Sequence, residues 1–138
     1  MQTDLLRETV ADCIDILRRY EFDALAFRGQ SGSLIAPVLA LALDKTMLMV
    51  RKNMTDCHSG QIVEGDLGAQ RYIIIDDLIS SGKTVTTIVE EIAKVARKAV
   101  CLGVLEYTRT EAMKINPRRP LSPARSYGFY NDETNVFV

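Results

Sequence analysis

Apolar residues recur at helical spacing in two stretches of the chain, residues 4–20 and 84–98. The apolar face consists of Leu6, Val10, Cys13, Ile14 and Leu17 in the first stretch, and of Val85, Ile88, Ile92, Val95 and Ala96 in the second. Such a stripe predicts an amphipathic helix that packs on a core. A third helix is expected from Ser33, which can cap it, through Leu43, because Pro37 lies early enough to be tolerated.

Short apolar runs at residues 23–27, 46–50, 71–75 and 99–105 predict four strands. The run at 71–75 shows too little alternation for a half-exposed strand, so we expect it near the centre of a sheet. Strand and helix alternate along the chain, which is typical of parallel strands joined by helical crossovers. The predicted fold class is α/β, with a Rossmann-like parallel sheet flanked by helices.

The C-terminal part of the chain, residues 107–138, has a different pattern. Three of the four prolines lie between Pro117 and Pro123, and apolar periodicity returns only weakly at residues 127–130 and 136–138. We expect a small irregular appendage that leans on the sheet. The chain is therefore predicted to be a single domain over residues 1–138, with its core at about 22–106.

Composition narrows the class of protein. The 138 residues are 47% hydrophobic and 25% charged with a net charge of −1, which excludes a disordered chain and disfavours a globally basic nucleic-acid binder. Three isolated cysteines, Cys13, Cys57 and Cys101, argue against a disulfide framework and a zinc site. The longest apolar run, residues 34–43, is too short for a membrane span, and the N-terminus does not resemble a secretory signal. We expect a cytoplasmic protein.

Three loops follow predicted strands, at residues 27–33, 51–68 and 76–84. In open parallel sheets ligands bind at the carboxyl ends of the strands, so these loops are the candidates for a binding site. The third loop ends in Ser81-Gly82-Lys83-Thr84, which is similar to the end of a Walker A element. That element needs a glycine five positions before Gly82, where this chain has Asp77, so a nucleotide P-loop is disfavoured.

The same loop can form a different phosphate site. Small residues before a helix N-terminus bring backbone N–H groups together, and Ser80, Ser81 and Thr84 add hydroxyl donors for one monophosphate. Directly upstream, Asp76 and Asp77 end a buried strand, and carboxylates accept hydrogen bonds from the vicinal hydroxyls of a sugar. Phosphate donors next to two such acids describe a ribose 5-phosphate site. The competing interpretation is a capped helix after a strand with an incidental acid pair.

Residues 72–84 resemble the signature of type I phosphoribosyltransferases, in which hydrophobic residues, two acids, two hydrophobic residues, two small hydroxyl residues, glycine, any residue and threonine follow one another. The resemblance implies that Asp76 and Asp77 hold the ribose hydroxyls of 5-phosphoribosyl-1-pyrophosphate (PRPP). It assigns the 5-phosphate to Ile79, Ser80, Ser81, Gly82, Lys83 and Thr84. Lys83 is equally well explained as a solvated side chain.

The first loop contains Arg28 followed by Gly29. Glycine lets the backbone approach a ligand closely, and the planar guanidinium of arginine suits pyrophosphate. This segment is similar to the pyrophosphate loop of adenine-type phosphoribosyltransferases, where a non-proline cis peptide is common, so the resemblance suggests one next to Arg28. The alternative is a glycine turn with a surface arginine.

The second loop begins with Arg51 and Lys52 and continues to His58, the one histidine of the chain. It is similar to the flexible loop of orotate phosphoribosyltransferases, which runs from Arg-Lys to His-Gly. That family carries a further lysine in between, whereas residues 53–57 here contain none, and Ser59 separates His58 from the following glycine. The resemblance implies that Arg51 and Lys52 bind pyrophosphate and that His58 donates to phosphate oxygens. The alternative is a surface histidine.

The implied reaction is Mg²⁺-dependent transfer of a phosphoribosyl group from PRPP to a nucleobase, with release of pyrophosphate. Asp76, Asp77 and His58 are the expected catalytic residues, and Mg²⁺ is expected to be held mainly through substrate and water rather than by direct protein ligands. A hood over the base is expected from about residues 1–20 and 107–138, where Tyr107 can stack on a base or simply pack. Five basic residues within 109–125 slightly favour orotate over a purine base, and a solvated basic loop explains them at least as well. The resemblance also implies a homodimer.

Two other functions stay open from the sequence. One is a non-catalytic regulatory module that keeps the PRPP site but senses ligand or binds RNA, which the missing loop lysine and the basic segment favour. The other is a structural relative with an inactive site, which the intact acid pair disfavours.

Overall fold

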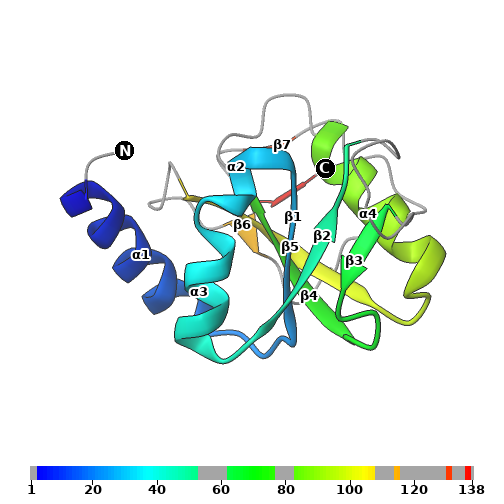
Figure 1. The fold of residues 1–138 in the computed structure, drawn as a ribbon, viewed down its shortest axis with the longest axis horizontal. Coiled ribbons are helices and arrows are strands. Elements are labelled where there is room, and N and C mark those ends of the chain that lie inside the picture. The colour runs from blue at the N-terminus through cyan, green and yellow to red at the C-terminus, as the bar shows by residue number, and fades with distance from the viewer. Residues whose placement is uncertain are drawn as a thin grey trace.

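The computed structural model describes residues 3–52, 62–76 and 83–107, together with three short strands at 114–115, 130–131 and 136–137. The helices are α1 (Thr3–Leu17), α2 (Gly29–Ser33), α3 (Ala36–Leu43) and α4 (Lys83–Val95). The strands are β1 (Ala24–Arg28), β2 (Thr46–Val50), β3 (Val63–Gly65), β4 (Arg71–Asp76), β5 (Val100–Glu106), β6 (Lys114–Ile115), β7 (Tyr130–Asn131) and β8 (Val136–Phe137). Figure 1 shows their arrangement.

The main sheet has six strands in the order β3-β2-β1-β4-β5-β6. The four inner strands run parallel, while β3 and β6 pair antiparallel at the two edges. The predicted α/β fold class is confirmed, and β4 lies between β1 and β5, as its continuous apolar run predicts. A separate two-stranded sheet is formed by β7 and β8.

Helices cover both faces of this sheet, α1 and α3 on one side and α4 on the other (Figure 1). Each face has its own apolar cluster. Beneath α1 and α3, the cluster includes Leu17, Leu25, Leu39, Ile73 and Leu105. Beneath α4, it includes Ala26, Leu48, Ile74, Ile88 and Val104. Neighbouring positions of β4 and β5 alternate between the two clusters because successive strand side chains point to opposite faces.

The predicted helix at residues 33–43 differs in its start. The helix α3 begins at Ala36 with Ile35 in the N-cap position and Pro37 in the first turn, so Ser33 does not cap it. The preceding residues, expected to form a loop, make the short helix α2 instead. Gly32 explains this turn: a side chain at that position would collide with Phe27, so only glycine lets α2 pack on the strand ends.

Two further expectations need correction. The stretch 51–68 was expected to be loop throughout, but it contains β3, which pairs with β2 at the sheet edge. Val95 was expected on the buried face of α4, yet its side chain is 50% exposed, since the helix ends there and the chain turns toward β5. No helix in the described ranges is both long and apolar enough to cross a membrane.

Candidate functional site

The strand order reverses between β1 and β4, where a ligand crevice is expected. The chain leaves β1 toward β2 on one side and leaves β4 toward β5 on the other, so the crossovers diverge at these two neighbouring strands. Ligands of open α/β sheets bind where the strand order reverses in this way, outside the carboxyl ends of the strands. Arg28 ends β1 and Asp76 ends β4, so two of the predicted site residues flank this point.

Asp76 is 5% exposed, although it is a carboxylic acid. Four buried residues of β4 precede Asp76 and hold its backbone in the sheet. In the register of the two strands, Asp76 pairs with Glu106 of β5. A buried carboxylate is costly unless hydrogen bonds or charges offset its desolvation, and Asp76 does have an interaction partner. The neighbouring acid, Asp77, lies outside the described residues.

The helix α4 begins at Lys83, a short distance along the chain from the end of β4. The N-terminus of a helix offers free N–H groups and the positive end of its dipole, which favour an anion there. Thr84 is half-buried in this first turn. The other predicted phosphate ligands, Ile79, Ser80, Ser81, Gly82 and the side chain of Lys83, lie outside the described residues.

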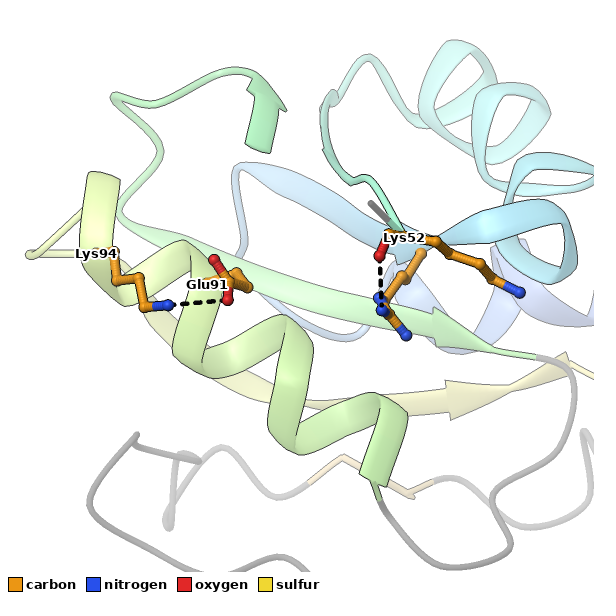
Figure 2. A network of polar contacts seen from close by, with 4 residues as sticks. Lys52, Glu91 and Lys94 are labelled. Atoms are coloured by element: carbon orange, nitrogen blue, oxygen red, sulfur yellow. Dashed lines mark hydrogen bonds and ion pairs between the residues drawn. The ribbon is translucent and has the colours of Figure 1, made fainter. Parts of the chain in front are cut away.

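Arg28 and Lys52 come together at the ends of β1 and β2. The Nη2 atom of Arg28 donates a hydrogen bond of 3.4 Å to the backbone carbonyl of Lys52. Figure 2 shows this carbonyl as the acceptor, while the Lys52 side chain extends away from the Glu91–Lys94 ion pair of α4. The buried Nε of Arg28 has no hydrogen-bond partner among the described residues, so it is a donor with spare capacity.

Gly29 lets the Lys52 side chain lie directly on the backbone. A Cβ atom at Gly29 would stand 2.5 Å from Lys52 Cε and 3.3 Å from Nζ, and the φ angle of +68° is one that residues with side chains rarely adopt. The Lys52 side chain therefore lies against the start of α2, next to the residue that carries the Arg28 guanidinium. The peptide bonds on both sides of Arg28 are trans, in contrast to the cis bond that the resemblance suggested.

Arg51 points elsewhere. Its Nη2 atom makes an ion pair of 3.1 Å with Glu64 of β3, and both side chains are 25% exposed. Such a half-buried pair holds the guanidinium at the sheet edge, and its Nε is buried without a hydrogen-bond partner among the described residues. The structure thus brings Arg28 and Lys52 together but does not bring Arg51 to them. His58, the other expected pyrophosphate ligand, lies outside the described residues.

Tyr107 packs in the apolar cluster beneath α1 and α3 and is 5% exposed. Packing therefore accounts for its position. The residue before it, Glu106, is fully buried at the end of β5, beside Asp76, and the sequence analysis did not single it out. A glutamate that closes an apolar run, as in residues 100–106, is the signal that could have found it.

The remaining features lie away from this crevice. A cavity of about 370 Å³ opens at the opposite end of the sheet, between residues 67–70 and 95–99, and no predicted site residue lines it. Burial raises the pKa of the Cys13 and Cys101 thiols to about 12, so both are inert at neutral pH. The described residues include no cluster of three or more side chains that could bind a metal.

No protein-family model matches the sequence. Among curated proteins, it is similar to the orotate phosphoribosyltransferase of Methanocorpusculum labreanum, with 30% identity over 94 residues, which is 68% of this chain and 54% of the relative. The corresponding protein of Sulfolobus acidocaldarius is 25% identical over 95 residues, or 69% and 48% of the two chains. The chain thus spans about half the length of the curated relatives it matches.

Solved structures share the fold. The UMP synthase of Leishmania donovani superposes with a TM-score of 0.59 at 23% identity, covering 72% of this chain and 21% of that one. The adenine phosphoribosyltransferase of Rhodothermus marinus gives 0.57 at 18% identity and covers 80% and 74% of the two chains. The sequence matches to orotate phosphoribosyltransferases, together with the shared fold, support the type I phosphoribosyltransferase family that the acid-pair motif predicted.

Proposed function

We propose that this protein transfers a phosphoribosyl group from PRPP to a nucleobase and releases pyrophosphate. The observation that carries the proposal is the arrangement at the crevice between β1 and β4. An acid, Asp76, ends β4. At the ends of β1 and β2 the Arg28 guanidinium donates to the Lys52 carbonyl, and the Lys52 side chain lies over Gly29. Such a site offers hydrogen-bond acceptors for a sugar diol on one side and donors for pyrophosphate on the other.

The sugar would bind on the acidic side. Asp76, with Asp77 as its proposed companion, accepts hydrogen bonds from the two ribose hydroxyls and stabilises the positive charge that develops on the ring as the bond to pyrophosphate breaks. Residues 79–84, which lead into α4, are the proposed site of the 5-phosphate, because the N-terminus of a helix favours an anion. Holding both ends of the sugar fixes its reacting carbon in the crevice.

The leaving group would bind on the basic side. Arg28 and Lys52 donate to the pyrophosphate oxygens and offset the negative charge that the leaving group gains. His58 is proposed to add a further donor when pyrophosphate is bound. Arg51 would have to exchange its ion pair with Glu64 for pyrophosphate.

Magnesium fits this site as part of the substrate complex. The described residues supply Asp76 but no set of ligands that could hold the ion by themselves, so pyrophosphate, ribose hydroxyls and water are its proposed ligands. When bound, the ion neutralises pyrophosphate charge. The chain itself then contributes the diol acceptors and the phosphate donors.

The base is proposed to be orotate in preference to a purine, because the basic residues within 109–125 suit an anionic base. The hood at residues 1–20 and 107–138 is proposed to cover it, with Tyr107 reaching the base only if its ring leaves the packed position. The competing function is a regulatory module that binds PRPP or RNA without turnover. The absence of a lysine in residues 53–57 favours this alternative, since loop lysines assist the departure of pyrophosphate in the family that the loop resembles.

One assay separates these functions. Purified protein receives Mg²⁺, PRPP and each nucleobase in turn, and pyrophosphate release is measured. Release with one base supports the transferase, and release with none refutes it. If the protein binds PRPP but releases pyrophosphate with none of the bases, the result supports the regulatory module.

The homodimer implied by the family resemblance is proposed to form through α3. This helix has no charged residue, yet Leu41 is 87% and Val38 44% exposed, and Leu34, which precedes the helix, is 53% exposed. A helix that is apolar all round is normally buried, and Val38 and Leu41, three residues apart, lie on one side of it. A second copy of the same uncharged surface can cover it without opposing like charges.

The cytoplasmic location expected from the sequence stays a prediction.

A further inference from the structure

Glu106 and Asp76 occupy paired positions on neighbouring strands. In the parallel register of β4 and β5, Ile74 pairs with Val104. Two residues further along each strand, at the carboxyl ends, Asp76 pairs with Glu106. Glu106 is 0% exposed and Asp76 is 5% exposed. Two carboxylic acids are therefore buried side by side where the candidate ligand would bind.

Both side chains belong to the same face of the sheet. Ile74 and Val104 point into the cluster beneath α4, and the following pair, Ile75 and Leu105, points into the opposite cluster. Because strand side chains alternate, Asp76 and Glu106 return to the α4 face. Val85 and Ile88, in the first turns of α4, belong to the cluster on that face. The positive end of the α4 dipole thus lies at the same end of the sheet as the two carboxylates.

A buried acid at the end of β5 is costly unless its interactions offset the desolvation of the carboxylate. An apolar side chain there would continue the cluster that Val104 belongs to and would avoid the desolvation of a carboxylate. Tyr107 already continues the opposite cluster. Glu106 does have an interaction partner, and its position beside Asp76 places its charge next to the proposed diol acceptor.

We propose that Glu106 is a positioning residue for Asp76. Like charges on adjacent strands repel, so Glu106 directs the Asp76 carboxylate away from β5 and toward the open crevice, and it strengthens the hydrogen bonds that Asp76 accepts. Full burial keeps Glu106 itself from touching the ligand. This role rests on the proposed function, since it matters only when Asp76 binds a sugar diol.

Calorimetric titration of the whole protein with PRPP in the presence of Mg²⁺ tests the role. The charge-removing variant Glu106→Gln is expected to bind PRPP about tenfold more weakly. Glu106→Asp keeps the charge but, because its side chain is shorter, moves the charge closer to the β5 backbone. Its affinity for PRPP is therefore expected to lie between those of Glu106→Gln and the wild type. Pyrophosphate alone, which would contact Arg28 and Lys52, is expected to bind all three proteins equally. If Glu106 had only a structural role, its substitution would change the affinities for PRPP and for pyrophosphate to the same extent.

The matched control is Cys101→Ala, which changes a fully buried residue on the same face of β5, far from the site. It is expected to lower stability and leave PRPP binding unchanged. Equal PRPP affinity of wild type and Glu106→Gln overturns the inference. If Glu106→Gln does not fold, Glu106→Asp decides alone, and wild-type affinity in that variant overturns it. A wild type that binds no PRPP refutes the proposed function, a separate outcome.

Discussion

Replacing Gly29 with alanine tests whether the cationic loop depends on its backbone. The φ angle of +68° costs a residue with a side chain about 1 to 2 kcal/mol. The new Cβ would also stand 2.5 Å from Lys52 Cε, but that atom belongs to a flexible side chain that can move at little cost. We therefore expect Gly29→Ala to lose about 1 to 2 kcal/mol of unfolding free energy and to displace the Lys52 ammonium group.

Two other glycines calibrate this magnitude. Gly65 has a φ of +122°, and its Cβ would overlap the backbone carbonyl of Met47, which cannot move without disturbing the β2–β3 ladder. Strain and overpacking together predict a loss of about 3 kcal/mol for Gly65→Ala. Gly68 has no left-handed φ, and a Cβ atom there would lie 3.5 Å from Asp66 Oδ1, an ordinary contact. Gly68→Ala is expected to stay within about 0.5 kcal/mol of the wild type.

Urea unfolding and pyrophosphate titration separate these effects. Stability is expected to fall in the order Gly68→Ala, Gly29→Ala, Gly65→Ala. Only Gly29→Ala is expected to weaken pyrophosphate binding, by about tenfold, because only that change moves a side chain proposed to bind pyrophosphate. Wild-type stability together with wild-type pyrophosphate affinity in Gly29→Ala would refute the reasoning, as would an equal loss of affinity in the Gly68→Ala control.

Three further predictions use other parts of the molecule. Asp76→Asn is expected to keep the fold but lose turnover by orders of magnitude in the pyrophosphate-release assay, and near-normal turnover would contradict its role. Leu41→Glu is expected to give a monomer by light scattering while Val95→Glu, which changes an exposed residue of α4, does not; equal masses contradict the α3 interface. Burial raises the pKa of Cys13 and Cys101 from 9.0 to about 12, so folding favours the protonated thiols and stability is lost as the pH rises through that window. Urea midpoints between pH 8 and pH 11 should fall, and less steeply in Cys101→Ala.

The strands were predictable because each carries its own local signal. The run from Thr46 to Val50 has the bounds of β2, and the continuous apolar run at 71–75 indicated a strand buried on both faces. Parallel pairing then followed from the alternation with helices. The strand β3 was not predicted, because it is only three residues long and has no hydrophobic pattern of its own. It forms at the sheet edge through its pairing with β2.

The start of α3 shows a different limit. Ser33 has the residue type of a helix cap, and local propensity favours it there. Packing decided otherwise, because Gly32 lets residues 29–33 coil tightly against the strand ends, and the following helix restarts at Ala36. A cap rule examines a few neighbouring residues, whereas the contact between Gly32 and β1 depends on the folded sheet.

The candidate site divides in the same way. The positions of Arg28, Lys52 and Asp76 at one edge of the sheet were predictable, because each lies at or just after the end of a parallel strand. The ion pair of Arg51 with Glu64 could not be found, because it depends on the unexpected strand β3. Glu106 needed the register of β4 and β5, which includes a shift between Tyr72 and Ile73.

The order of strands in the sheet keeps the opposite charges of the site on separate sides. Along the chain the two cations, Arg28 and Lys52, come first, and the two acids, Asp76 and Glu106, follow. In the sheet, β2 and β1 lie on one side of the crevice and β4 and β5 on the other, so both cations and both acids are sorted to opposite sides. A ligand with a polyanionic end and a diol end fits that separation in one orientation. The proposed reaction requires that orientation, because pyrophosphate must leave toward the cations while the sugar stays with the acids.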